Sequence, residues 1–228
     1  MVTAVIVAAG RSSRMGEGTD KQFVPLRGHP LLAYTLSKFQ QCPQINEMVI
    51  VIRPERRPDL QSLLKNYAIH KARYFADGGA ERQDSVWNGL QSVRRETDIV
   101  LIHDGARPCI TIDMIQRTLT VATEHGAAVV ATKITDTIKE ASEQLFVQRT
   151  VDRGRLWAVQ TPQGFRLPWI RDGYTEVRRR GLIVTDDAAA VELTGKPIYL
   201  VENRLLNLKV TTPADLALAE WSLRDTCL

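Results

Sequence analysis

The 228-residue sequence has few cysteines and no long apolar run. Cys42, Cys109 and Cys227 are odd in number, lie far apart and form no CxxC pair. This usage argues against a disulfide framework or a structural zinc site and favours a reducing compartment. No secretory or membrane-spanning segment precedes the first apolar strand, so we expect a cytoplasmic protein with no membrane partner.

Aromatic residues are also scarce, at 6% of the chain, and they do not alternate with basic residues. Proteins that bind single-stranded nucleic acid need aromatic side chains beside positive charge, so we do not expect a nucleic-acid partner. The net charge of +4 suits small anionic ligands as well as nucleic acid. The 44% hydrophobic content excludes a disordered chain, and the length suits one large α/β domain.

Both common glycine motifs for phosphate binding are absent: the chain has no GxxxxGK[ST], and its early glycines do not form GxGxxG. Residues 2–9 instead form an apolar run that is typical of a buried parallel strand, and a cationic loop follows it. Gly10 permits close approach of the backbone to a ligand, and Arg11, Arg14 and Lys21 suit a polyphosphate. Taken alone, the loop is equally consistent with an ordinary strand-to-helix turn that carries solvated basic residues.

Apolar strands and amphipathic helices alternate through the first 132 residues. The expected strands are 2–9, 47–52, 73–76, 98–103 and 126–132, with helices between them. Strand-helix alternation with short links predicts an α/β fold, a Rossmann-like, mostly parallel twisted sheet flanked by helices. Such sheets bind ligands at the carboxyl ends of their strands, which places the Gly10 loop at the ligand-binding edge.

A glycine turn follows the third expected strand. Gly78 and Gly79 lead into a helix whose first turn holds Arg82 and Ser85. Backbone amides at a glycine turn and helix start favour an acceptor-rich group, although a plain start of a helix is the alternative. Arg82 and Ser85 are therefore candidate cleft residues.

The fourth expected strand ends in the segment DGARP. A carboxylate at this place, Asp104, can hold a metal, a sugar hydroxyl or a hydrated cation, and Arg107 lies three residues on. The neighbouring His103 has no second histidine at ligand spacing, so we interpret it as structural. Asp104 and Arg107 are strong site candidates.

The organisation changes at residues 134–156, where polar and apolar residues alternate around a polar turn. This pattern predicts a β-hairpin that protrudes from the single domain of residues 1–228. A hairpin outside a compact domain has little of its own chain to bury against, so we expect it to contact a second subunit in a homodimer. Further on, Lys209 lies between apolar residues in an extended segment, where a lysine is more informative than on a helix face.

The ordered motifs of the chain resemble those of the 2-C-methyl-D-erythritol 4-phosphate cytidylyltransferase family. They are AAGRSSRMG with DKQF, DGGAERQDSV, HDGARP, DTIKE, TVDRGRLW, QTPQGF, TDDAAAVE and NLKVTTPADLALAE, and they run the whole length. The first loop alone indicates only a nucleotidyltransferase of the sugar-nucleotide type, with its glycosyltransferase-A-like sheet. HDGARP, TVDR with TPQ, and KVT narrow the resemblance to cytidylyltransferases that act on polyol phosphates.

The resemblance implies transfer of CMP from CTP to 2-C-methyl-D-erythritol 4-phosphate, with release of pyrophosphate and with Mg²⁺ held mainly by the triphosphate. By motif match, Arg14 and Lys21 would stabilise charge on the α-phosphate, while Arg153 and Lys209 would orient the substrate phosphate. In this family Arg153, on the hairpin, reaches the site of the neighbouring subunit. The positions that match the methylerythritol phosphate site are Asp104, Arg107, Thr137, Thr161 and Thr185. The positions that match the cytidine pocket are Ala8, Ala9, Gly10, Gly79 and Ser85. Arg82 and Gly105 are two further expected substrate-binding residues.

Two residues depart from the family pattern. Ala80 stands where some members have aspartate beside the base, so base selection must rest on backbone groups and Ser85. Ser12 replaces a glycine that is common in the first loop.

The nearest alternative function is that of a ribitol-5-phosphate cytidylyltransferase, and an alternative of another class is a non-catalytic nucleotide-binding module. The four cations Arg14, Lys21, Arg153 and Lys209 disfavour a module that only binds. We name no metal ligand in the chain.

Overall fold

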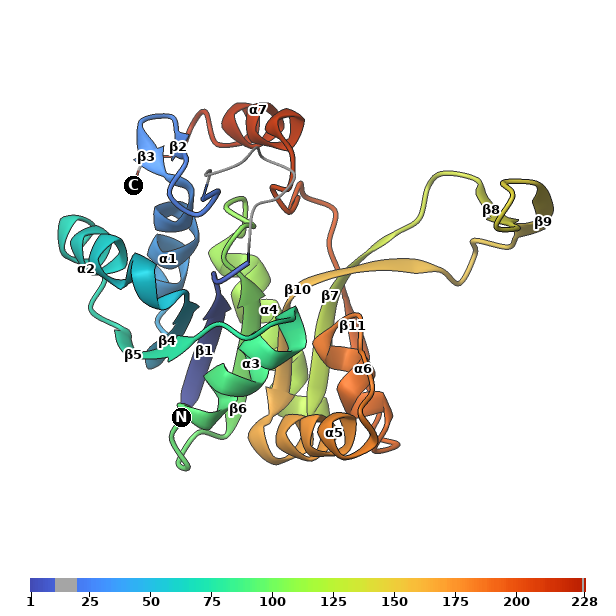
Figure 1. Ribbon diagram of the computed structural model, residues 1–228, viewed down its shortest axis with the longest axis horizontal. Coiled ribbons are helices and arrows are strands. Elements are labelled where there is room, and N and C mark those ends of the chain that lie inside the picture. Colours follow the sequence, from blue (N-terminus) through green and yellow to red (C-terminus); the bar gives the residue numbers. More distant parts are fainter. Residues whose placement is uncertain (11–19, 227) are drawn as a thin grey trace.

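The computed structural model describes residues 1–10, 20–226 and 228. Its centre is a seven-stranded sheet in the order β11-β7-β10-β6-β1-β4-β5 (Figure 1). Strands β1, β4, β5 and β6 are mutually parallel, as predicted, and β11 is parallel to β7. The strands are β1 (Val2–Val7), β4 (Glu47–Ile52), β5 (Ala72–Asp77), β6 (Ile99–Asp104), β7 (Ala127–Lys133), β10 (Trp157–Arg166) and β11 (Tyr199–Glu202).

The central strands are apolar on both sides because helices cover both faces of the sheet. One face packs against α1 (Leu31–Gln41), α2 (Arg57–Asn66) and α4 (Ile112–His125). The other face packs against α3 (Arg82–Gln91), α5 (Leu167–Arg180) and α6 (Asp187–Glu192). All six residues of both β4 and β6 are buried. This two-sided burial is the physical reason that the strands read as continuous apolar runs.

Strand β10 is the main feature of the sheet that the sequence analysis did not specify. It runs antiparallel to β6 and to β7 and lies between them, although it follows the hairpin in the chain. Its TPQGF segment is buried, and the Thr161-Pro162 peptide bond is cis. This position brings Thr161 beside the carboxyl end of β6.

The predicted hairpin at residues 134–156 is present. Two long extended segments of the chain carry it away from the sheet (Figure 1). Its strands β8 (Ile138–Ala141) and β9 (Val147–Val151) pair antiparallel with each other in a separate two-stranded sheet. Leu145 is 86% exposed and Phe146 is 75% exposed at its tip. We call residues 134–156 the arm.

Smaller elements complete the fold. They are β2 (Pro25–Leu26), β3 (His29–Pro30), the 3-10 helix η2 (Pro54–Arg56) and α7 (Pro213–Ser222). Thr212 caps α7 by accepting a hydrogen bond from the Asp215 amide, and Asp215 reciprocates at the Thr212 amide. None of the helices in the described part of the chain is long and apolar enough to cross a bilayer.

Candidate active site

A cavity of about 770 Å³ opens at the carboxyl ends of β1, β4, β5 and β6. This is the edge at which the sequence analysis placed the ligand. The candidate residues that line the cavity are Ala9, Gly10, Lys21, Gly79, Arg82, Ser85, Asp104 and Lys209. Five separate stretches of the sequence therefore meet in this cavity.

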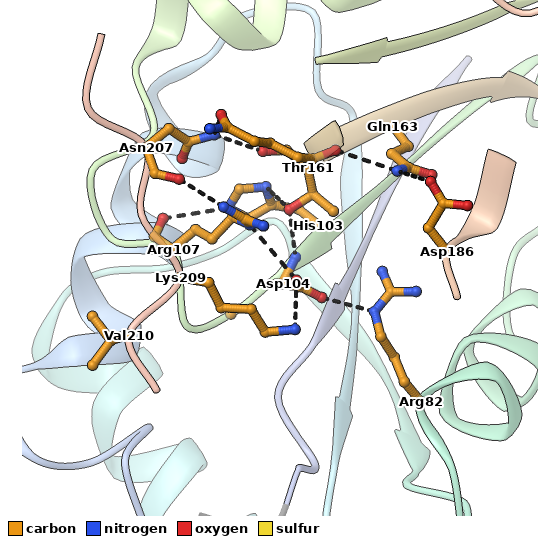
Figure 2. Close-up of polar contacts among 12 residues, drawn as sticks. Arg82, His103, Asp104, Arg107, Thr161, Gln163, Asp186, Asn207, Lys209 and Val210 are labelled. Carbon is orange, nitrogen blue, oxygen red and sulfur yellow. Dashed lines mark hydrogen bonds and ion pairs between the residues drawn. The ribbon is translucent and has the colours of Figure 1, made fainter. Parts of the chain in front are cut away.

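Asp104, the last residue of β6, is the centre of a charged cluster (Figure 2). Its carboxylate lies 2.9 Å from Lys209 Nζ, 2.9 Å from Arg82 Nε and 3.6 Å from Arg107 Nε. Burial by itself would raise the pKa of this carboxyl, but the charges of Arg82, Lys209 and Arg107 together hold its pKa well below the usual range. Three cations around one anion leave a net positive charge beside the cavity, which suits a phosphate.

Arg82 links this cluster to a second buried carboxylate that the sequence analysis did not assign to the site. Its guanidinium binds Asp187 through two hydrogen bonds of 3.1 and 2.8 Å, and Asp187 is fully buried. Burial acts to lower the pKa of Arg82, yet Asp187 and Asp104 raise it well above its usual value. Tyr174 donates a 2.7 Å hydrogen bond to Asp187. The only sequence signal for Asp187 was its place in the TDDAAAVE motif.

Two further candidates support the cluster from behind the cavity wall. The Thr161 hydroxyl accepts a 3.1 Å hydrogen bond from the Asp104 amide and lies 3.1 Å from His103 Nδ1. Arg107 donates a 2.7 Å hydrogen bond to the Asn207 carbonyl, and the Asn207 amide group donates to the Thr161 carbonyl at 2.9 Å (Figure 2). These contacts tie β10 and the segment that carries Lys209 to the end of β6.

His103 is structural in this arrangement, in agreement with its interpretation from the sequence. It is fully buried, and burial lowers the pKa of its imidazole to about 3. The ring is therefore neutral, with Nδ1 able to accept from Thr161 and Nε2 facing the Arg107 carbonyl at 3.4 Å.

The neutral buried imidazole predicts a specific loss of stability in acid. Between pH 6.5 and pH 3 the unfolded chain binds a proton at position 103 that the folded chain does not, so stability falls as the pH falls. Relative to a His103→Gln variant, the wild type should lose about 2 to 3 kcal/mol more unfolding free energy between pH 7 and pH 4.5. Urea unfolding at both pH values measures this difference. His70 is exposed and provides the control variant His70→Gln, whose unfolding free energy should change between the two pH values as it does in the wild type. An equal change in all three proteins would contradict the assignment.

The backbone of the turn after β5 packs closely against its neighbours at the start of α3. A side-chain Cβ on Gly78 would lie 2.3 Å from the Ala9 Cβ, and one on Gly79 would lie 2.2 Å from the Asp84 Cβ, so only glycine fits at both positions. The Gly79 amide donates to Ser85 Oγ at 3.0 Å, and Ser85 donates to the Glu81 carbonyl at 3.2 Å. Ala80, one of the departures from the family pattern, also lines the cavity here.

The structure brings some candidates near the cavity and leaves others apart from it within one chain. Ala8 and Gly105 are neighbours of lining residues in the chain and lie side by side, since a Cβ on Gly105 would lie 3.2 Å from the Ala8 Cβ. Thr137 and Arg153 are exposed on the arm, with Arg153 Nη1 donating to the Thr135 carbonyl, and neither lines the cavity. Thr185 precedes the start of α6 and also lies outside the lining. Arg14 and Ser12 lie outside the described residues.

The carboxylates do not form a protein cage for a metal ion. Among residues 1–10, 20–226 and 228, no group of three histidine, cysteine or acidic side chains lies at ligand spacing. Asp104 is already neutralised by three cations. These residues fit a divalent ion only if it arrives with oxygen ligands from a polyphosphate.

Comparison with known proteins connects this geometry to one family. The family model described as 2-C-methyl-D-erythritol 4-phosphate cytidylyltransferase matches residues 2–225. The chain belongs to this family. The enzyme of that name from Geobacillus thermodenitrificans is 46% identical over 217 residues, which cover 95% of this chain and 94% of the relative. The chloroplastic enzyme from Oryza sativa is 41% identical over 224 residues, 98% of this chain and 75% of the relative.

Solved structures agree with this membership. The crystal structure of 2-C-methyl-D-erythritol 4-phosphate cytidylyltransferase from Thermus thermophilus is 33% identical and covers 96% of this chain and 98% of that chain, with a TM-score of 0.80. The 4-diphosphocytidyl-2C-methyl-D-erythritol synthase from Anaerococcus prevotii is 27% identical, covers 98% of each chain and has a TM-score of 0.85. Membership of the family makes the chain a cytidylyltransferase, and it confirms the fold class expected from the sequence.

Proposed function

We propose that the chain transfers CMP from CTP to 2-C-methyl-D-erythritol 4-phosphate, giving 4-diphosphocytidyl-2-C-methyl-D-erythritol and pyrophosphate. The observation that carries this proposal is the cluster at Asp104, where Arg82, Lys209 and Arg107 surround one carboxylate beside the cavity that Lys21 also lines. A cationic wall suits the substrate phosphate, and Asp104 keeps carboxylate lone pairs that can accept polyol hydroxyls. The names of the relatives supply the identity of the two substrates.

The chemistry that these residues perform is positioning and charge stabilisation. Lys21, whose ammonium donates to the Val210 carbonyl at 3.1 Å, is held beside the segment that carries Lys209. Together with Arg14, it would stabilise the charge that builds on the α-phosphate during in-line attack. The attacking phosphate oxygen is already anionic, so no general base is required. A Mg²⁺ ion bound to the triphosphate supplies further neutralisation of phosphate charge.

Pyrophosphate release tests both the reaction and the acceptor. Purified protein with CTP and Mg²⁺ should release pyrophosphate with methylerythritol 4-phosphate and not with ribitol 5-phosphate or without an acceptor. Release with ribitol 5-phosphate alone would retain the mechanism and replace the substrate. Release with neither acceptor would favour the non-catalytic binding module.

The arm supplies the remaining contacts in the proposed assembly. Arg153 and Thr137 are exposed on it and lie outside the cavity of their own chain, so we propose a homodimer in which each arm completes the partner's site. The exposed Leu145 and Phe146 at the tip give the arm apolar surface to bury against a second copy. The cytoplasm is the proposed location, since curated relatives such as the two Geobacillus enzymes are bacterial.

Mixing two inactive variants tests whether Arg153 acts across subunits. Arg153→Ala and Lys21→Ala homodimers should each be strongly impaired. After subunit exchange, half of the dimers are mixed and hold one intact site each, so about a quarter of wild-type activity should return. Chromatography with light scattering checks the dimer. No recovery after verified exchange would show that Arg153 does not serve the partner's site.

A further inference from the structure

A second charged cluster lies next to Lys21 at the carboxyl end of β4, and the proposed chemistry does not use it. The Asp20 carboxylate, only 8% exposed, lies 2.5 Å from Arg53 Nη2 and 3.1 Å from Arg56 Nε. It also accepts a 3.1 Å hydrogen bond from the Gln22 amide. Arg53 lines the same cavity as Lys21. One carboxylate is thus shared by two guanidinium groups beside the proposed reaction centre.

The two arginines are not held equally. Arg56 also contacts Asp59 at 2.9 Å and stacks on Phe23 with its guanidinium 4.4 Å from the ring centre. Arg53 has only the exposed Glu55, at 3.4 Å, as a second ionic partner among the described residues. Arg56 Nε is buried and, despite its closeness to Asp20, makes no aligned hydrogen bond. It can therefore take over Asp20 if Arg53 turns away, so that the buried carboxylate keeps a partner.

The order of the strands places Arg53 on the side where a leaving group belongs. Val7 of β1 pairs with Asp104 of β6 on one side and with Val51 of β4 on the other. Arg53, two residues beyond Val51, and the acceptor-side cluster at Asp104 are separated by two strand spacings, about 10 Å. In-line displacement puts the leaving pyrophosphate opposite the attacking oxygen. With the acceptor held over β6, the leaving group lies toward β4.

The two faces of the sheet separate this cluster from the expected nucleobase pocket. Gly79 and Ser85 belong to the turn and helix on the α3 face, where Ala9 and Val86 pack. Phe23, on which Arg56 stacks, packs with the core on the α1 and α2 face. Arg53 is therefore aligned with Lys21 and the phosphates rather than with the base.

We propose that Arg53 binds the β- and γ-phosphates of CTP, and the pyrophosphate product, by exchanging Asp20 for phosphate oxygens. Arg56 neutralises Asp20 in the bound state. The inference rests on the proposed function for the direction of attack, but the binding of inorganic pyrophosphate can be measured without turnover.

The test compares Arg53→Gln with a matched control, Arg57→Gln. Arg57 is four residues along, exposed, paired with Asp77 at 2.7 Å and outside the cavity lining. Loss of a guanidinium contact to phosphate should raise the KM for CTP and the inhibition constant of pyrophosphate about tenfold. The KM for methylerythritol phosphate should stay within about twofold, since Arg53 is not on the acceptor side. Arg57→Gln should behave like the wild type, and Arg53→Lys should recover part of the pyrophosphate affinity.

Calorimetric titration of inorganic pyrophosphate into each folded variant separates this inference from the proposed function. A wild type that releases no pyrophosphate with any acceptor would defeat the proposed function, whereas the titration would still report on Arg53. Wild-type affinity for pyrophosphate in an Arg53→Gln variant that unfolds at the same temperature as the wild type would overturn the inference. An equal rise in the KM of both substrates would overturn it as well.

Discussion

Replacing Lys21 by alanine is expected to lower kcat by about three orders of magnitude, while the dissociation constant for CTP rises much less. The ammonium lies at the cavity and is anchored by the Val210 carbonyl, next to the segment of Lys209. A fixed charge that meets the α-phosphate stabilises the extra charge of the transition state more than that of bound CTP. The loss should therefore fall mainly on turnover.

Single-turnover measurements and equilibrium CTP binding separate the two effects. Lys21→Met, which keeps most of the side-chain length, should be as impaired as Lys21→Ala because the missing element is charge. Lys65→Ala on α2, where the lysine is exposed, is the control and should keep wild-type rates. Equal losses in kcat and in CTP affinity would assign Lys21 to ground-state binding instead.

Replacing Arg82 by methionine is expected to destabilise the fold by about 3 to 5 kcal/mol, the cost of breaking a buried ion pair from one side. The Asp187 carboxylate now binds Arg82 and Tyr174, and in the variant it would keep only the hydrogen bond from the Tyr174 hydroxyl. Because Asp187 is fully buried, water cannot replace the lost partner. Asp104 would lose one of its three cations. Activity should fall as well, since the Asp104 cluster would shift.

Urea unfolding measures this loss of stability, and a double-mutant cycle shows how much of it comes from the Arg82–Asp187 pair. Adding Asp187→Asn to Arg82→Met should restore part of the stability, because the uncompensated buried charge is removed. Arg179→Met is a matched control: Arg179 pairs with Glu176 on the exposed surface of α5, so its loss should lower the unfolding free energy far less than loss of Arg82. A similar cost for both arginine variants would show that burial of the Arg82 pair has no special energetic weight.

The strands and the ligand-binding edge could be predicted because their signals are local. The bounds of β4 were predicted to the residue, since the strand is covered on both faces and its residues after Glu47 form an unbroken apolar run. Residues at or just beyond the carboxyl ends of the strands, such as Asp104 and Gly79, fall at one edge in any parallel sheet. The hairpin pattern at residues 134–156 was confirmed for the same reason, because alternation and a polar turn need no distant partner.

The position of β10 in the sheet and the partners of the charged groups could not be predicted from local sequence patterns. Insertion of β10 between β6 and β7 depends on the packing of the whole sheet, and it alone puts Thr161 beside Asp104. Asp187 stood out only as part of the TDDAAAVE motif, yet its carboxylate meets Arg82, 105 positions away in the chain. Arg53 and Asp20, 33 positions apart, likewise gave no signal of their pairing.

The sequence by itself determined the strands, their common orientation in the first half of the chain and the residue types at the ligand edge. These follow from apolar periodicity and from the need to satisfy backbone groups, which act over a few residues. The tertiary structure alone decided which cation faces which carboxylate. Ion pairs form between whatever side chains the fold brings within a few ångströms, so their partners depend on the packed arrangement rather than on any local pattern.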